Sequence, residues 1–285
     1  MTGKNWILLV AGSQGWEHYN HQANVCLHYH LLKRHGIPDE QIVVMMFDDI
    51  AYNKENPHKG KIVSIIDGLD VYSGVPKDYT GKDVTPKNFL KALRGVKSTG
   101  KKVIDSGPND NIYVFMTGLG QEGRFQFPET ALSPDALIDT IKVMHGENEF
   151  SKMVIYMDSD YSGSMFEGLP SDVNVFALTS CSKYTTNTPT DYDDERKVYS
   201  SDLFSSTWLR YLNGVDFTKE KFTELVKTKQ SKYVEDNPDE ACPCRFGDES
   251  ITQCHLSEFL QKRTPNKLFK PCSRKHAAEA HANDQ

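Results

Sequence analysis

Short apolar runs alternate with amphipathic segments along most of the chain. Runs such as "NWILLVAG" and "KMVIYMD" contain few polar residues, which is typical of strands buried on both faces of a sheet. Two amphipathic segments begin with Thr85-Pro86 and Ser133-Pro134, a favoured combination of N-cap and first helical residue. This alternation predicts a mostly parallel sheet with helices on both faces. We expect strands at residues 5–12, 41–49, 111–118, 152–158 and 173–180, and helices at 20–36, 83–95, 133–146, 201–213 and 218–231.

The ends of these strands are the expected place for function. Parallel strands end at one edge of their sheet, and α/β proteins bind and react there. Four predicted strands end in polar or glycine-containing stretches, which are "GSQGWEHYNH", "FDDIAYNKENP", "MTGLGQEG" and "MDSDYSGSM". The segment 52–82 is long and rich in Gly, Pro and Lys, so we expect a surface excursion with room for a small hairpin.

Charge and length narrow the class of protein. A net charge of −6 gives no general basic face, so we expect neither nucleic acid nor an anionic membrane as a partner. No apolar run approaches the roughly 20 residues of a membrane span. The first run follows almost no basic region and looks like a core strand, so no signal peptide is visible. We expect one domain over residues 1–262 and a polar tail over residues 263–285.

The six cysteines are unevenly placed. Cys26 and Cys181 fall in predicted core segments. The other four crowd the last part of the chain and leave two alternatives open, disulfides in an oxidising compartment or a zinc site with His255. The spacing "CPC" is not the usual C-x2-C, so we expect no metal and no cofactor. These four are Cys242, Cys244, Cys254 and Cys272.

Several long motifs resemble the legumain, or asparaginyl endopeptidase, family. They are "GIPDEQIVVMMFDDIAYNKENP" (36–57), "GVPKDYTGKDVTPKNFLKALRG" (74–95), "SGPNDNIYVF" (106–115) and "SGSM" (162–165). The resemblance covers roughly residues 4–260. It implies a caspase-like three-layer α/β/α sandwich with a mostly parallel, about six-stranded sheet. It also implies descent from a thiol protease that cuts after Asn and sometimes Asp.

The catalytic positions depart from the family pattern. A cysteine protease needs a thiolate, a neighbouring imidazole and backbone N–H donors for the oxyanion. By the resemblance, Leu119 stands where the family has its histidine, and Asp160 stands where it has its cysteine. The turns at Gly120 and Asp160 are the candidates for the oxyanion donors. Since leucine carries no proton and aspartate no thiol, we expect the chain to be inactive as a thiol protease.

The resemblance also assigns the substrate pocket. His18 replaces the Asn that orients the family's histidine, and Asn20 replaces an Arg that holds the substrate. His21, Asp158 and Asp202 match family pocket positions. The pocket thus keeps acids and a histidine but loses a guanidinium, and we hypothesise that a Lys or Arg side chain suits it better than Asn.

Two other kinds of chemistry stay open at this stage. Asp158, Asp160 and Asp202 form a candidate acid cluster, which would raise at least one pKa and activate water or bind a divalent cation. Alternatively, these acids only face solvent. Cys181 with His18 or His21 is a candidate relocated thiol–imidazole pair.

The leading interpretation is a catalytically inactive legumain-like protein. It would keep the groove and bind a peptide, a protease or a protease inhibitor. The alternatives are a hydrolase of altered chemistry that uses Cys181 or the three acids, and an interaction or storage protein whose groove has no role. Family analogy places it in the lysosome, in the vacuole or outside the cell.

Overall fold

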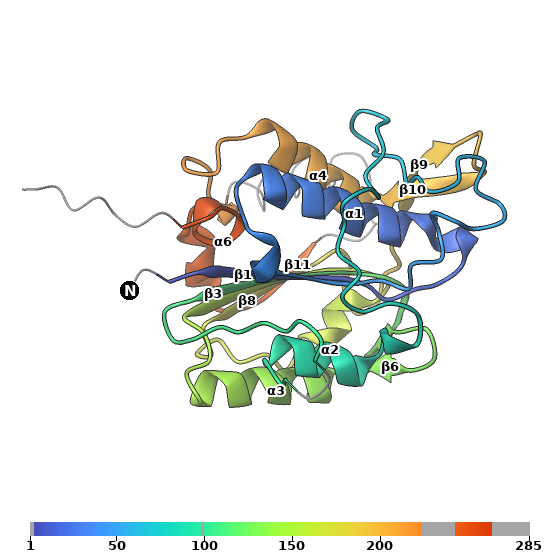
Figure 1. Cartoon of the computed structure of the whole chain (residues 1–285). Coiled ribbons are helices and arrows are strands. Elements are labelled where there is room, and N and C mark those ends of the chain that lie inside the picture. Colours follow the sequence, from blue (N-terminus) through green and yellow to red (C-terminus); the bar gives the residue numbers. More distant parts are fainter. Residues whose placement is uncertain (1–2, 98–99, 224–242, 264–285) are drawn as a thin grey trace, which may run out of the picture.

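A six-stranded sheet forms the centre of the protein in the computed structural model, which describes residues 3–97, 100–223 and 243–263. The strand order is β11-β8-β7-β3-β1-β2, and all neighbours are parallel except β11, which runs antiparallel to β8 (Figure 1). The strands are β1 (Asn5–Ala11), β2 (Ile42–Met45), β3 (Asn111–Thr117), β7 (Lys152–Asp158), β8 (Val175–Thr179) and β11 (Cys244–Gly247). The predicted fold class, a mostly parallel sheet of about six strands inside an α/β/α sandwich, is confirmed.

The five predicted strands are all present, and the largest difference from the predicted bounds is in β2. Strand β2 ends at Met45, whereas the apolar run predicted an end at residue 49. Asp48 has a positive φ of 67°, a left-handed conformation that a strand does not contain. The chain therefore leaves the sheet before the run of apolar residues ends, and the acids that follow the run belong to a loop.

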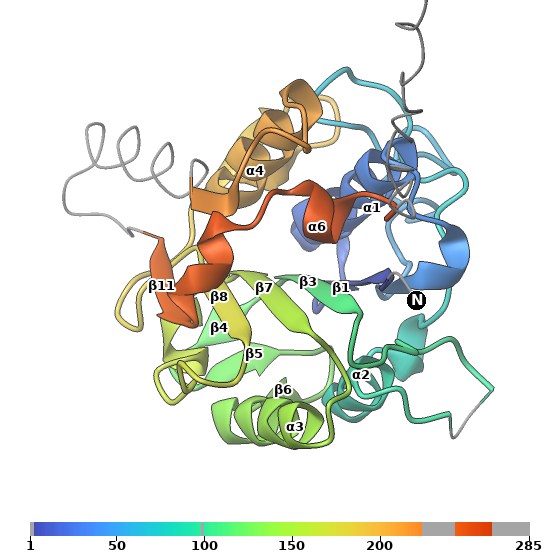
Figure 2. The ribbon, with the colours of Figure 1, turned by 90° about the vertical axis from the view of Figure 1, so that its left-hand side faces the viewer.

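Helices cover both faces of the sheet. Helices α1 (Tyr19–Arg34) and α4 (Leu203–Gly214) lie on one face, and α2 (Pro86–Leu93) and α3 (Pro134–Gly146) lie on the other (Figures 1 and 2). Both predicted N-caps are confirmed. Thr85 Oγ1 accepts from the Asn88 N–H at 3.1 Å, and Ser133 Oγ accepts from the Ala136 N–H at 3.2 Å. The helix predicted at 218–231 lies largely outside the described residues.

Smaller elements frame the carboxyl edge of the sheet. One antiparallel pair joins β9 (Pro189–Asp193) to β10 (Val198–Asp202), which leads directly into α4. A second small sheet contains β4 (Gly120–Gln121), β5 (Arg124–Gln126) and β6 (Ala131–Leu132), and it begins directly after β3. Residues 52–80 form no helix or strand, and an isolated bridge between Val63 and Asp70 is the small hairpin of this excursion.

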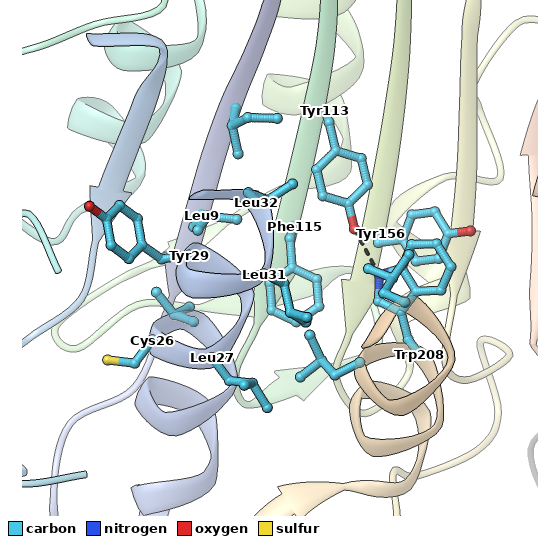
Figure 3. Packing of buried hydrophobic residues seen from close by; sticks show 14 of the residues in the cluster. Leu9, Cys26, Leu27, Tyr29, Leu31, Leu32, Tyr113, Phe115, Tyr156 and Trp208 are labelled. Atoms are coloured by element: carbon cyan, nitrogen blue, oxygen red, sulfur yellow. Dashed lines mark hydrogen bonds between the residues drawn. The ribbon is translucent and has the colours of Figure 1, made fainter. Parts of the chain in front are cut away.

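The core has one layer on each face of the sheet, because alternate strand residues point to opposite faces. On the α1 side, Trp208 stacks on Tyr156 with ring centroids 4.7 Å apart, and its Nε1–H donates to the Tyr113 hydroxyl at 3.0 Å (Figure 3). His28 of α1 is completely buried in this layer, with its ring centroid 4.6 Å from that of Phe115. Neither ring nitrogen of His28 has a hydrogen-bond partner. This layer therefore contains a buried polar ring whose lost hydrogen bonds to water are not replaced by hydrogen bonds within the protein.

The opposite edge of the sheet is closed by the short helix α6 (Ser257–Leu260). Asn5 Nδ2 donates to the carbonyl of Gln261 at 2.7 Å, and Asn111 Nδ2 donates to the carbonyl of Glu258 at 2.9 Å. These two asparagines are the first residues of neighbouring parallel strands, so their side chains fasten the late segment to the start of the sheet. The polar tail predicted at 263–285 lies, apart from its first residue, outside the described residues.

Candidate functional site

The turns after β3 and β7 touch each other at the carboxyl edge of the sheet. Thr117 pairs with Asp158 in the ladder, and the Gly118 N–H donates to the Asp158 carbonyl at 3.1 Å. Gly120 lies so close to the next turn that a Cβ built on it would lie 2.1 Å from the Asp160 carbonyl oxygen. Only glycine allows this approach. The sequence correctly predicted that these two strand ends meet.

The two side chains at the predicted catalytic positions lie at the rim of this junction. Leu119 is 37% exposed, although its carbonyl accepts from the Gln126 N–H at 2.9 Å. Asp160 is half-buried, and the next residue, Tyr161, has a left-handed φ of 52°. Leu119 offers no group that takes or gives a proton, and Asp160 offers a carboxylate in place of a sulfur. Their roles stay predictions from the resemblance.

Asp158 lies behind this rim and is completely buried. Its Oδ1 accepts from Asn187 Nδ2 at 2.8 Å, and its Oδ2 accepts from the Ser205 N–H at 3.0 Å and from the Ser205 hydroxyl. Asp160 Oδ1 accepts from the Asn187 backbone N–H at 2.5 Å. One asparagine of a connecting loop therefore contacts both carboxylates.

Asp202 forms a second buried polar group with α1. Asn20 Nδ2 lies 2.9 Å from both carboxylate oxygens of Asp202, and Asn24 Nδ2 lies 3.3 Å from Oδ2. Burial raises the pKa of Asp202 well above its usual value, and the charge of nearby Asp158 raises it further. Because these carboxylates already accept hydrogen bonds from their own chain, the hypothesis of a pocket for Lys or Arg is weakened and stays a prediction.

His21 is held neutral beside this group. Its Nδ1 lies 2.6 Å from the Ser13 hydroxyl, and its Nε2 lies 3.8 Å from Asp202 Oδ2, beyond hydrogen-bonding distance. Burial, with a smaller contribution from nearby His18, lowers the pKa of His21 to about 3. The His18 ring stacks on that of His21 with centroids 5.7 Å apart.

The predicted pocket residues thus form a closed polar cluster. Their exposed fractions are 0% for Asp158, 3% for Asp202, 4% for His21 and 6% for Asn20. A pocket of about 370 Å³ lies elsewhere, between α1 and the excursion, and no predicted site residue lines it. The residues that line it include Leu27, His30, Arg34, Asp67 and Val71.

The cysteine alternatives find little support. Cys181 is buried, and burial together with the charges of Asp158 and Asp160 raises its pKa to about 12 despite a hydrogen bond from Ser180. Its thiol is therefore protonated at neutral pH. Cys254 is a free thiol, while Cys242 and Cys272 lie outside the described residues. Within the described ranges, no three His, Cys, Asp or Glu side chains are grouped as metal ligands.

The sequence missed Asn187 and Ser205, the main partners of Asp158. Asn187 lies in a loop with no periodic pattern, so no signal in the sequence pointed to it. Ser205 follows Asp202 by three residues in "SSDLFSS", and a serine in the first turn of a helix often presents both its N–H and its hydroxyl to an acid.

An α/β/α sandwich with polar residues at the carboxyl ends of β3 and β7 is a caspase-like fold. The fold is similar to that of caspase-1 from Spodoptera frugiperda, with a TM-score of 0.53 over 87% of this chain and 88% of the caspase, at 9% sequence identity. That likeness concerns the fold alone. The profile of the Peptidase C13 family matches residues 5–262, and the chain belongs to this family.

Relatives within the family are much closer in sequence. The chain is 42% identical over 262 residues to legumain of Rattus norvegicus and 41% identical over 262 residues to that of Homo sapiens. It is 37% identical over 281 residues to the vacuolar-processing enzyme delta-isozyme of Arabidopsis thaliana. These alignments cover 90%, 90% and 94% of this chain, but only 59%, 59% and 60% of the relatives. No helix in the described part of the chain is long and apolar enough to cross a membrane.

Proposed function

We propose that this protein is a catalytically inactive member of the legumain family that acts by binding a peptide, a protease or a protease inhibitor. The proposal rests on which residues stand in the two adjoining turns. Leu119 and Asp160 stand at the positions that the resemblance assigns to the imidazole and the sulfur. Without both groups, the scaffold has no means of forming an acyl intermediate.

The nearby residues do not replace the missing pair. A thiol protease needs a thiolate beside an imidazole that can take a proton. The pKa of Cys181 is raised to about 12, and that of His21 is lowered to about 3. Between these values both groups are neutral, so they do not form an ion pair. The hydrolase that uses Cys181 is therefore the weaker candidate.

Two of the three acids, Asp158 and Asp202, also suit a structural role better than hydrolysis. Asp158 and Asp202 are buried and accept hydrogen bonds from Asn187, Ser205 and Asn20. A carboxylate that activates water must reach that water, and 0% and 3% exposure leave almost no access. We therefore assign these acids to holding the edge of the sheet together.

We infer the cellular location from the names of the relatives. One relative is named a vacuolar-processing enzyme, and others are legumains. By this analogy we place the protein in a vacuole, in a lysosome or outside the cell, where its ligand would be a protease of the same compartment, an inhibitor or an extended peptide.

A fluorogenic peptide with Asn before the cleavage site tests the proposal. We expect no turnover from pH 4 to pH 8, and turnover above that of a heat-denatured sample would overturn the proposal. The double variant Leu119→His and Asp160→Cys is expected to show at most partial turnover, because Asn20 still stands in place of the family's Arg. Full, Asn-selective turnover would show that this position matters less than we infer.

A further inference from the structure

The pocket between α1 and the excursion is separate from the candidate functional site. It has a volume of about 370 Å³, and its walls are the second half of α1 and residues 64–71 of the excursion. Asn20 and His21, the site residues on α1, lie in the first turn of that helix. The volume falls in the range of about 300–1,000 Å³ that small-molecule sites have. The chemistry of the two walls therefore indicates what kind of ligand the pocket fits.

The two walls of this pocket are fixed to each other. The excursion forms a hairpin here, in which the Ser64 N–H donates to the Leu69 carbonyl at 2.8 Å and the Val71 N–H donates to the Ile62 carbonyl at 2.7 Å. His30 Nε2 of α1 lies 3.1 Å from the Val71 carbonyl, which accepts its proton. The pocket therefore has a backbone frame that does not depend on a bound ligand.

The α1 wall of the pocket is cationic. Lys33 and Arg34 both line it. Arg34 Nη2 donates to Asn213 Oδ1 at 2.6 Å, and Lys33 Nζ lies 2.9 Å from Asp39 Oδ1. A guanidinium has five N–H donors and an ammonium has three, so these contacts use only part of the capacity of either side chain. This wall can therefore donate further hydrogen bonds to an anion.

The hairpin wall of the pocket is anionic. Asp67 Oδ1 accepts from the Leu69 N–H at 3.1 Å, and Asp70 Oδ1 accepts from the Ile62 N–H at 3.1 Å and from the Tyr72 N–H at 3.0 Å. Among the described residues, the second carboxylate oxygen of neither acid accepts a hydrogen bond, and neither acid forms an ion pair. Both acids are exposed. This wall can therefore accept hydrogen bonds from a cation.

Apolar side chains lie between the two charged walls. Leu27 and Val71 are 4% and 6% exposed, whereas Leu69 is 65% exposed, and all three line the pocket. A ligand that covers Leu69 removes apolar surface from water, which favours binding. The pocket therefore fits a molecule with a positive end, a negative end and an apolar group between them.

We propose that this pocket binds a zwitterionic dipeptide with an apolar side chain. The ammonium group of the dipeptide lies against Asp67 and Asp70. Its carboxylate lies against Lys33 and Arg34, and its side chain covers Leu69. A sphere of 370 Å³ is about 9 Å across, and two extended residues span at most about 7 Å, so both charged ends fit inside. Three extended residues span up to about 11 Å and do not fit in this way.

A series of four peptides tests the proposal by isothermal titration calorimetry at pH 7 on the full chain. The series is leucyl-leucine, acetyl-leucyl-leucine without the ammonium, leucyl-leucine amide without the carboxylate, and acetyl-leucyl-leucine amide without either charge. We expect leucyl-leucine to bind, and each single cap to weaken binding at least about tenfold. No binding of leucyl-leucine, or equal binding of all four peptides, would overturn the proposal.

Two variants test which wall contacts which end of the dipeptide. Asp67→Asn should weaken leucyl-leucine at least about threefold and leave acetyl-leucyl-leucine unchanged, because that peptide has no ammonium group to lose. Arg34→Gln should weaken leucyl-leucine and leave leucyl-leucine amide unchanged, because that peptide has no carboxylate. Damage to the fold would weaken all four peptides alike, and that result, or no effect of either variant, would overturn the assignment.

Two control variants change acids outside the pocket. Asp194→Asn removes an acid with a 93% exposed side chain in the turn between β9 and β10, and Asp160→Asn removes an acid of the candidate functional site. Neither residue lines the pocket, so we expect both variants to bind leucyl-leucine within about twofold of the wild type. A loss of at least about tenfold in Asp160→Asn would place the dipeptide at the candidate functional site and overturn the inference.

Discussion

Replacement of His28 with leucine is expected to flatten the pH dependence of stability between pH 7 and pH 5. His28 is completely buried with both ring nitrogens unpartnered, and burial lowers its pKa from 6.5 to about 3. The unfolded chain takes up a proton below pH 6.5, but the folded chain does not until near pH 3. The free energy of unfolding is therefore not reduced by His28 above pH 6.5. It decreases as the pH falls from 6.5 toward 3, because only the unfolded chain binds the proton there.

The size of the effect follows from these two values. Between pH 7 and pH 5, proton uptake by the unfolded state alone favours unfolding by a factor of about 25, or about 2 kcal/mol. His21, whose pKa is also lowered to about 3, makes a similar contribution in both proteins. Leucine has nearly the volume of histidine and no nitrogen to leave unpaired, so we expect the fold to tolerate it. The variant should lose about 2 kcal/mol less than the wild type on acidification.

Urea denaturation followed by tryptophan fluorescence at pH 7, 6 and 5 measures this difference. His145→Leu is the matched control, because it removes a half-buried histidine on α3, outside the layer that contains His28. Equal losses in His28→Leu and the wild type, within about 0.5 kcal/mol, would refute the reasoning, since the buried ring would then not exclude its proton.

Three further predictions concern the carboxyl edge of the sheet. Gly120→Ala places a Cβ against the Asp160 carbonyl, so we expect a loss of about 2 kcal/mol in urea denaturation, and a change below about 0.5 kcal/mol would contradict that contact. Cys181 should resist iodoacetamide at pH 7 in the folded protein and react in urea, as read by peptide mass spectrometry, and rapid labelling of the folded protein would show a reactive thiol. Asp202 has a raised pKa, so its contribution to stability is present at acidic pH and is lost as the pH rises. Asp202→Asn should therefore lose stability more steeply than the wild type on acidification, and an unchanged slope in urea denaturation would show that the pKa is not raised.

The central strands and the helix starts were predictable because local signals and tertiary packing agree there. The apolar run 152–158 is buried on both faces, and Thr85 and Ser133 cap helices as their chemistry requires. Strand β11 was missed. Residues 244–247 are half-buried or exposed and contain no apolar run, so only their pairing with β8, about 70 residues earlier in the chain, makes them a strand.

The site was predictable only in part. The parallel arrangement of β3 and β7 is enough to bring residues 118–120 to residues 158–160, and the sequence indicated this. The hydrogen-bond partners of the acids could not be predicted in the same way. Asn20 and Asn24 are four residues apart on one face of α1 and both donate to Asp202, but the sequence analysis did not link either of them to this acid. Asn187 gave no signal at all, because its position depends on how a loop returns to the sheet.

The contact between the two turns at the edge of the sheet joins main-chain atoms, the backbone of Gly120 and the carbonyl of Asp160. The side chains at positions 119 and 160 do not make that contact. Substitutions at these two positions leave the junction intact as long as Gly120 remains. Such a scaffold can change the side chains at these two positions without changing its shape, so this edge of the sheet can be selected for a new task independently of the fold.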